Sequence, residues 1–199
     1  MRSLAHAQTY TPPGERCDIP VATLTKRWTL GELHSLPDDG NKYEVVRGEL
    51  FVTPAPMPTH ETVCMRLRRI LDRYVEAENL GAVYTPRAVL QFEDSEVEPD
   101  LMVRREHVGD SSTWSSAPLP SLIVEVLSPT TTRRDRIQKR DLYTDAGVGE
   151  YWLVDAERRV FTVIRKERED LVVTDEMTWH PTGASRPLAF AVAQVFGCS

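Results

Sequence analysis

The sequence has 199 residues, of which 41% are hydrophobic and 27% are charged, and its formal net charge is −6. This length and composition suffice for one globular domain with its own core. The negative charge argues against a protein that binds nucleic acid by bulk electrostatics, because such proteins normally carry an excess of Lys and Arg. Three cysteines, Cys17, Cys64 and Cys198, form no CxxC or Cys/His motif that would indicate zinc or a disulfide framework, which favours a reducing compartment.

Composition divides the chain into three predicted regions. Residues 1–27 mix Pro, Gly and polar residues without a sustained period, so we expect an N-terminal arm that is partly disordered. Residues 28–173 form the predicted domain, and residues 174–199 form a C-terminal extension that packs on the domain or on a partner. The N-terminal segment lacks an apolar signal core, and no segment approaches the roughly 18 apolar residues that span a bilayer. We therefore expect a cytoplasmic protein with no membrane partner.

The first half of the predicted domain mixes helices and strands. Thr29 is the expected N-cap of a short helix, Arg47 and Gly48 form a tight hairpin turn, and Gly81 ends a long amphipathic helix. In chain order, we expect a helix over 29–36, a hairpin over 43–54, a helix over 59–79, and strands over 82–93 and 98–105.

The second half continues the mixture. A loop over 106–120 leads to a strand over 121–127, and a helix over 128–147 ends at Gly147. Strands follow over 150–155 and 159–166, and the apolar segment 188–196 is expected to be a packing helix. These elements predict an α/β or α+β architecture in which a mixed central sheet is flanked by helices.

A carboxylate interrupts the apolar segment LIVEVL at 122–127. Because side chains alternate between the two faces of a strand, Glu125 shares a face with Ile123 and Leu127 and points into a covered layer. An isolated buried carboxylate costs several kcal/mol, so Glu125 must be protonated, paired with a cation or bound to a metal.

The following helix offers a cation for Glu125. A rotation of about 100° per residue places Asp135, Lys139 and Leu142 on one stripe, so Lys139 is carried toward the sheet if Leu142 packs on it. Asp135 and Lys139 also stand at i and i+4, and a local ion pair of about 0.3 to 0.5 kcal/mol is the alternative account of that pair.

Asp100 is a third candidate, at the start of the apolar run that follows Pro99. Alone, such a residue is more often a cap or a turn residue than a ligand. Two carboxylates on neighbouring strands, with a lysine from the next helix, nevertheless make an oxygen-rich site for Mg²⁺ or Mn²⁺ that suits phosphodiester hydrolysis.

Five motifs follow one another in the chain: YEVVRGEL at 43–50, a histidine after a proline-rich link, EPDLMV at 98–103, LIVEVLSPTTTRRDRIQKRDLY at 122–143, and AGVGEYWLVD at 146–155. Together they resemble the Uma-type restriction endonuclease domain family, a branch of the PD-D/E-X-K nuclease superfamily. The resemblance covers about residues 28–170. It implies a restriction-endonuclease-like fold and a Mg²⁺-dependent (or Mn²⁺-dependent) endonuclease that hydrolyses DNA.

The resemblance also implies roles for individual residues. Asp100 is the expected central metal-binding carboxylate and Glu125 the second, with the backbone carbonyl of Val126 completing the coordination. The usual lysine of the superfamily falls two positions after Glu125, where this chain has Leu127. Lys139 resembles the displaced lysine of this branch.

Further acidic and basic residues are expected near the metal. Glu49 matches an acidic residue that binds a second metal or a metal-bound water, although Glu44 competes for this role and Glu49 could be an exposed hairpin residue. His60 lies in the first turn of a helix, where the dipole lowers the pKa of an imidazole and favours anions, and capping or packing is its alternative role. Asp135 either orients Lys139 or caps its helix.

Two locally basic segments carry arginines that are expected to bind DNA phosphates, although solvated helix faces are the alternative reading. These residues are Arg66, Arg69, Arg73, Arg133, Arg134, Arg136 and Arg140.

The leading hypothesis is a metal-dependent deoxyribonuclease in which Lys139 helps the metal to activate a water. The first rival is a catalytically inactive module of the same fold that binds nucleic acid or protein, which Leu127 and the acidic net charge favour. The second rival is a structural ion pair of Glu125 and Lys139 without any metal. Assembly as a homodimer is expected, because such nucleases often need one subunit for each DNA strand.

Overall fold

The computed structural model of the chain describes residues 26–105, 113–128 and 135–197. Its first elements are α1 (Leu30–Leu33), β1 (Lys42–Val46), β2 (Glu49–Thr53), α2 (Pro58–Ala77), β3 (Ala82–Tyr84), β4 (Leu90–Gln91), β5 (Glu96–Val97) and β6 (Leu101–Arg104). They are followed by a 3₁₀ turn (Trp114–Ser116), β7 (Leu122–Val126), a π-helical turn (Asp135–Lys139), α4 (Arg140–Ala146), β8 (Tyr151–Asp155), β9 (Val160–Ile164), β10 (Leu171–Val173), β11 (Glu176–Trp179), β12 (Leu188–Ala191) and α5 (Ala193–Phe196).

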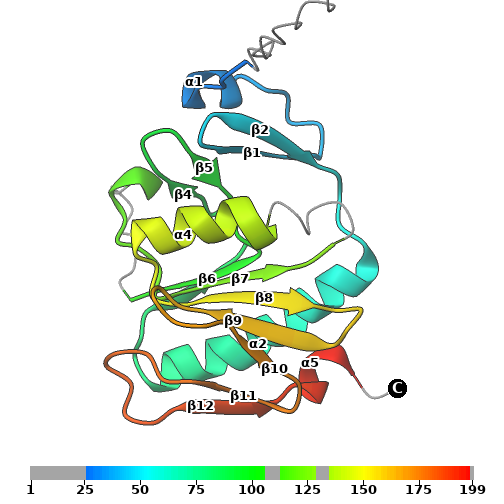
Figure 1. Cartoon of the computed structure of the whole chain (residues 1–199), viewed down its shortest axis with the longest axis vertical. Helices are drawn as coiled ribbons and strands as arrows, with labels where there is room; N and C mark the ends of the chain where they lie inside the picture. The colour runs from blue at the N-terminus through cyan, green and yellow to red at the C-terminus, as the bar shows by residue number, and fades with distance from the viewer. Residues whose placement is uncertain (1–25, 106–112, 129–134, 198–199) are drawn as a thin grey trace, which may run out of the picture.

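The central layer is a six-stranded sheet in the order β10-β9-β8-β7-β6-β3. Strands β7 and β8 run parallel, and the other neighbouring pairs run antiparallel. Figure 1 shows α2 on one face of this sheet and α4 on the other, with the β1–β2 hairpin beyond α4. The predicted class, a mixed central sheet flanked by helices, is confirmed.

Alternate residues of β7 face two separate core layers. Val124 and Val126 belong to the cluster that includes the buried residues of α2. Ile123 belongs to the opposite cluster with Leu142 of α4. Glu125 shares the face of Ile123, so the prediction that it points into a covered layer is confirmed.

The predicted N-cap and the predicted hairpin turn both form in the structure. Thr29 is the N-cap of α1: its hydroxyl accepts a hydrogen bond from the backbone N–H of Glu32, and the Glu32 carboxylate accepts one from the Thr29 N–H at 2.9 Å. Strands β1 and β2 pair antiparallel across Arg47 and Gly48, whose φ angles are 50° and 81°. The predicted helix start and hairpin turn are confirmed.

Gly81 has a different role from the one predicted. The helix α2 ends at Ala77, and Asn79 takes the left-handed conformation with φ of 52°. Gly81, with φ of 110°, lies against the end of β6, where an added Cβ would stand 1.8 Å from the carbonyl oxygen of Arg104. Close backbone contact therefore requires this glycine.

The helix predicted over 188–196 is wrong. Residues 188–191 form β12, which pairs with β11, and only residues 193–196 are helical. In β12 the side chains of Leu188 and Phe190 are buried while those of Ala189 and Ala191 are exposed, which is the period of a strand. Trp179 of β11 and Phe190 pack with Trp152 of the central sheet. The C-terminal hairpin thus completes the core below α2.

Some predictions concern segments outside the described residues: most of the arm 1–27, part of the loop 106–120, and the first turns of the helix 128–147. The described part of that helix starts with the π-helical turn and ends at Gly147, whose φ of 86° confirms the predicted stop. Within the part of the chain that the structure describes, no helix is both long and apolar enough to cross a membrane.

Candidate active site

A cleft of about 710 Å³ opens at the carboxyl end of β7. Its walls come from the connector between β2 and α2, the N-terminal half of α2, and the segment 85–87. Asp100, Glu125, Val126 and Asp135 line the cleft, with His60 from the first turn of α2. The carboxylates of β7 and of the segment that enters β6 therefore face one common space.

Asp100 is a buried carboxylate held by three donors. Its Oδ2 accepts hydrogen bonds from the backbone N–H of Val126 at 2.9 Å and from Nε2 of His60 at 3.0 Å. The Nζ atom of Lys42 lies 3.5 Å from Oδ1. Burial raises the pKa of Asp100, but the charge of Lys42 and the bond from His60 outweigh it and hold the pKa below its usual range. Asp100 is therefore ionised at neutral pH.

Glu125 is the second buried carboxylate of the cleft. Its Oε1 accepts hydrogen bonds from Nζ of Lys139 at 2.7 Å and from the hydroxyl of Tyr143 at 3.0 Å. Burial raises the pKa of Glu125 to about 7, against the opposing charge of Lys139, and the negative charge of Asp100 adds to the rise. This carboxylate holds a proton much more readily than an exposed glutamate does.

Lys139 is enclosed by carboxylates. Its Nζ lies 2.7 Å from Oε1 of Glu125, 2.7 Å from Oε1 of Glu44 and 3.8 Å from Oδ1 of Asp135. Burial lowers the pKa of Lys139, but the charges of Glu125 and Glu44 reverse the effect and raise it. The helix carries Lys139 to the sheet as the stripe predicts, behind Glu125 and outside the set of residues that line the cleft.

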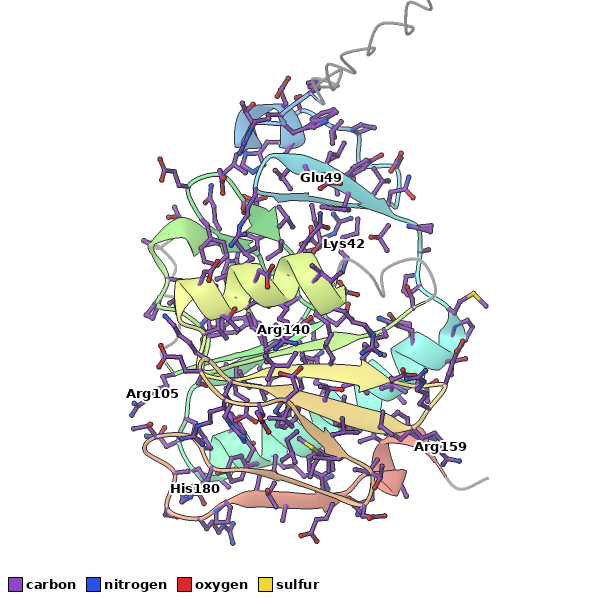
Figure 2. The ribbon with its side chains drawn as sticks, in the orientation of Figure 1. Lys42, Glu49, Arg105, Arg140, Arg159 and His180 are labelled. Atoms are coloured by element: carbon purple, nitrogen blue, oxygen red, sulfur yellow. The ribbon has the colours of Figure 1, made fainter. Side chains whose placement is uncertain are left out.

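The two competing glutamates occupy different surroundings. Glu44 is fully buried on β1, contacts Lys139, and accepts a hydrogen bond at 2.9 Å from the backbone N–H of Glu98. Glu49 is exposed on β2, where its carboxylate accepts a hydrogen bond at 2.7 Å from the amide of Gln138 (Figure 2). The structure brings Glu44 to the cluster around Lys139 and leaves Glu49 outside it.

The two accessory candidates both reach the cluster. His60 contacts Asp100, and the carboxylate raises the pKa of His60 although burial opposes it. The net shift of this pKa is therefore opposite to the lowering expected from the helix dipole, and the carboxylates of Asp100 and Glu61 account for it. Asp135 is 1% exposed and lies between the cleft and Lys139.

The five predicted phosphate-binding arginines that the structure describes do not line the cleft. Arg66 donates to the backbone carbonyl of Val195, and Arg69 and Arg73 are exposed further along α2. Arg136 pairs with Asp155 at 3.2 Å, Arg140 makes a bidentate pair with Asp170, and none of these five arginines lines the cleft. Arg133 and Arg134 lie outside the described residues.

Four residues that bring a cation or a thiol to the cleft are not among the predicted site residues. Lys42 of β1, Cys64 and Arg68 of α2, and Arg87 all line the cleft. For α2 a signal existed, because His60, Cys64 and Arg68 follow at intervals of four residues and hence share one helix face. For Lys42 and Arg87 the sequence offers no such signal, since their positions depend on how the hairpin and the segment 85–87 pack around the sheet.

The donor set of the cleft fits a hard divalent cation. Carboxylate oxygens are the ligands that Mg²⁺ and Mn²⁺ prefer in proteins. Within the described residues, Oε2 of Glu125 accepts no hydrogen bond, and a nearby cation would offset the burial that raises the pKa of Glu125. Asp100 and Glu125 are therefore the residues suited to hold such an ion.

Comparisons with known proteins identify the family. A family model described as Uma2, putative restriction endonuclease, matches residues 30–193. Among solved structures, the chain is similar to a putative nuclease belonging to DUF820 from Anabaena variabilis ATCC 29413, with a TM-score of 0.73 and 19% sequence identity over 85% of this chain and 97% of that one. This likeness shows a shared fold. No curated protein sequence matches the chain. The family match extends beyond residue 170 and includes the C-terminal hairpin. The chain belongs to the Uma2 family of putative restriction endonucleases.

Proposed function

We propose that this protein is a divalent-metal-dependent endonuclease that hydrolyses DNA phosphodiester bonds, with Mg²⁺ or Mn²⁺ as its cofactor. The observation that carries the proposal is the convergence of Asp100 and Glu125 on one cleft, with the ammonium of Lys139 against Glu125. Membership in a family of putative restriction endonucleases supports it. Paired carboxylates in a cleft commonly bind the metal ions that assist phosphodiester hydrolysis.

Each side chain has a defined part in the proposed site. A bound divalent cation would polarise the phosphate and acidify a water molecule. Asp100 stays ionised because Val126, His60 and Lys42 stabilise its charge, and it is therefore ready to bind a cation. Lys139 is a positioning residue: together with the hydroxyl of Tyr143 it fixes Oε1 of Glu125.

Phosphates would be bound by the cations that line the cleft, rather than by the five predicted arginines that the structure describes. Lys42, Arg68 and Arg87 line the cleft. Arg68 pairs with Asp72 and Arg87 with Asp38, both at exposed positions where a phosphate can compete with the aspartate. Contacts of this kind position a DNA backbone without reading its bases. The proposed substrate is therefore DNA bound through its phosphates.

Cleavage assays test the proposal. Supercoiled plasmid is incubated with the wild type, Asp100→Asn and Glu125→Gln in Mg²⁺, in Mn²⁺ and in a chelator. We expect cleavage by the wild type only with a metal, and a loss of about 100-fold or more in either variant. Asp141→Asn, at an exposed position of α4, is the matched control. Cleavage by Asp100→Asn or Glu125→Gln at the wild-type rate would reject the proposal.

One observation favours the rival of an inactive module. Lys139 is fully buried and contacts two carboxylates, so its charge is satisfied without a substrate or a metal. A thermal-shift titration with Mn²⁺ separates the two functions. If the protein is the proposed enzyme, Mn²⁺ should raise the melting temperature of the wild type but not that of Glu125→Gln. If it is an inactive module with a purely structural ion pair, Mn²⁺ should shift the melting temperature of neither protein.

A further inference from the structure

A second set of ligand atoms lies on the α2 side of the cleft. His60 and Cys64 stand four residues apart on α2, and Sγ of Cys64 lies 3.7 Å from Nδ1 of His60. Asp100 approaches the same imidazole, with its Oδ2 3.0 Å from Nε2. One ligand atom from each of the three side chains lies within 4.8 Å of the other two. All three residues line the cleft.

We propose that His60, Cys64 and Asp100 form a binding site for Zn²⁺ or a similar thiophilic divalent cation, distinct from the Asp100–Glu125 site for Mg²⁺. The two sites share Asp100, so their ions compete for this carboxylate. The binding site itself stands on the geometry of α2, whereas its effect on cleavage rests on the proposed function.

The spacing of the ligands fits a small tetrahedral ion after a modest closure. Zinc binds sulfur at about 2.3 Å, and imidazole nitrogen or carboxylate oxygen at about 2.0 to 2.2 Å, which places neighbouring ligand atoms roughly 3.4 Å apart. The three atoms lie within 4.8 Å of one another. An ion would bind one ring nitrogen of His60, so the proposal requires the Cys64 and Asp100 side chains to rotate toward that nitrogen. His60 and Cys64 need no backbone movement, because consecutive turns of one helix already hold them on one face.

The chemistry of the three donors selects the ion. A thiolate and an imidazole favour Zn²⁺, Co²⁺ or Cu²⁺, whereas Mg²⁺ prefers a shell made only of oxygens. Three protein ligands would leave the fourth tetrahedral position open to water or substrate. All three residues line the cleft, which gives solvent access to the site. Binding would release the thiol proton of Cys64 to solvent as the sulfur–metal bond forms.

A cobalt titration tests the site without any need for catalysis. The protein used for the titration is the variant Cys17→Ser, Cys198→Ser, in which Cys64 is the sole cysteine. We expect one Co²⁺ per chain and a thiolate-to-cobalt charge-transfer absorption in the near ultraviolet, which Zn²⁺ abolishes by displacement. Adding Cys64→Ser should remove this absorption, and circular dichroism verifies that the fold is retained.

Substitutions at two separate histidines, one in the proposed site and one far from it, provide a matched comparison. His60→Gln should weaken Co²⁺ binding by about 10-fold or more, because a ligand is lost. His180→Gln changes an exposed histidine in the β11–β12 hairpin, far from the cleft, and should leave binding unchanged (Figure 2). A folded single-cysteine protein without the charge-transfer absorption would overturn the proposal, as would equal binding by His60→Gln and His180→Gln.

Glu125→Gln separates this inference from the proposed function. The variant should lose its response to Mn²⁺ and keep the cobalt absorption, because Glu125 is no ligand of the second ion. With the wild type, Zn²⁺ should inhibit Mg²⁺-dependent cleavage, and Cys64→Ser should be inhibited at least 10-fold less strongly. A protein that binds Co²⁺ through Cys64 but cleaves no DNA would reject the nuclease and retain the zinc site.

Discussion

Nζ of Lys139 lies 2.7 Å from Oε1 of Glu125, and both side chains are almost completely buried. The pair joins the central strand β7 to the helix behind it, in a core layer where Glu44 and Asp135 are also buried around Lys139. A buried pair of this kind contributes little net stability relative to apolar residues, but removing one partner leaves an uncompensated charge. A substitution at Lys139 or Glu125 is therefore expected to change both the candidate site and the free energy of unfolding.

Lys139→Met should destabilise the metal-free protein by about 3 to 5 kcal/mol, because buried carboxylates lose their cation. Glu125→Gln in the same background should restore part of that loss, since the amide needs no counter-charge. Urea unfolding of the wild type, both single variants and the double variant measures the coupling free energy. Additive losses in the double variant would contradict direct coupling across the 2.7 Å contact.

Glu44 and Glu49 should differ strongly although both lie in the β1–β2 hairpin. Glu44→Gln weakens a fully buried contact to Lys139, so we expect a loss of about 3 kcal/mol in the free energy of unfolding. Glu49→Gln changes an exposed carboxylate bound to Gln138 and should cost less than about 1 kcal/mol. Chemical unfolding of the two variants measures the difference, and equal losses would contradict the assignment of Glu44 to the cluster.

The buried part of the site could be predicted because local periods determine it. The period of two in β7 places Glu125 beside Ile123, toward α4, and the helical stripe carries Lys139 toward the same face. Both relations hold within one strand or one helix. Neither requires knowledge of which distant segments meet.

The outer wall of the cleft could not be predicted, because it depends on tertiary packing. Lys42 reaches Asp100 only because β1 pairs with β5 and thereby lies beside the segment that enters β6. Arg66 donates to the backbone carbonyl of Val195 in α5, which follows the strand β12 where the sequence predicts a helix. In the segment 188–191 alanines occupy the exposed positions, so the apolar run hides the period of a strand.

Gly81→Ala should be strongly destabilising, and Gly40→Ala only weakly. Both glycines have positive φ angles, 110° and 87°, so both substitutions carry a backbone cost of about 1 to 2 kcal/mol. A Cβ at Gly81 would also stand 1.8 Å from the Arg104 carbonyl, whereas nothing lies within 4 Å at Gly40. We expect a difference of at least about 2 kcal/mol in urea unfolding. Equal losses would contradict the close backbone contact between Gly81 and Arg104 of β6.

The protonation of Glu125 should give the metal-free protein a distinct pH dependence. Its pKa in the folded protein is about 7, above the ordinary value of 4.5, so the folded state holds this proton more tightly than the unfolded state. The stability that the proton contributes is complete below pH 4.5 and is lost as the pH rises through 7. The total loss amounts to about 3 kcal/mol.

Glu125→Gln isolates this effect, because its amide stays neutral at every pH and provides a reference for the other titrating groups. Unfolding free energies of both proteins are measured in chelator between pH 4 and 8. The wild type should lose stability relative to Glu125→Gln as the pH rises through 7. A relative gain with rising pH would mean that Lys139 holds Glu125 ionised, and that burial does not dominate the charge of this carboxylate.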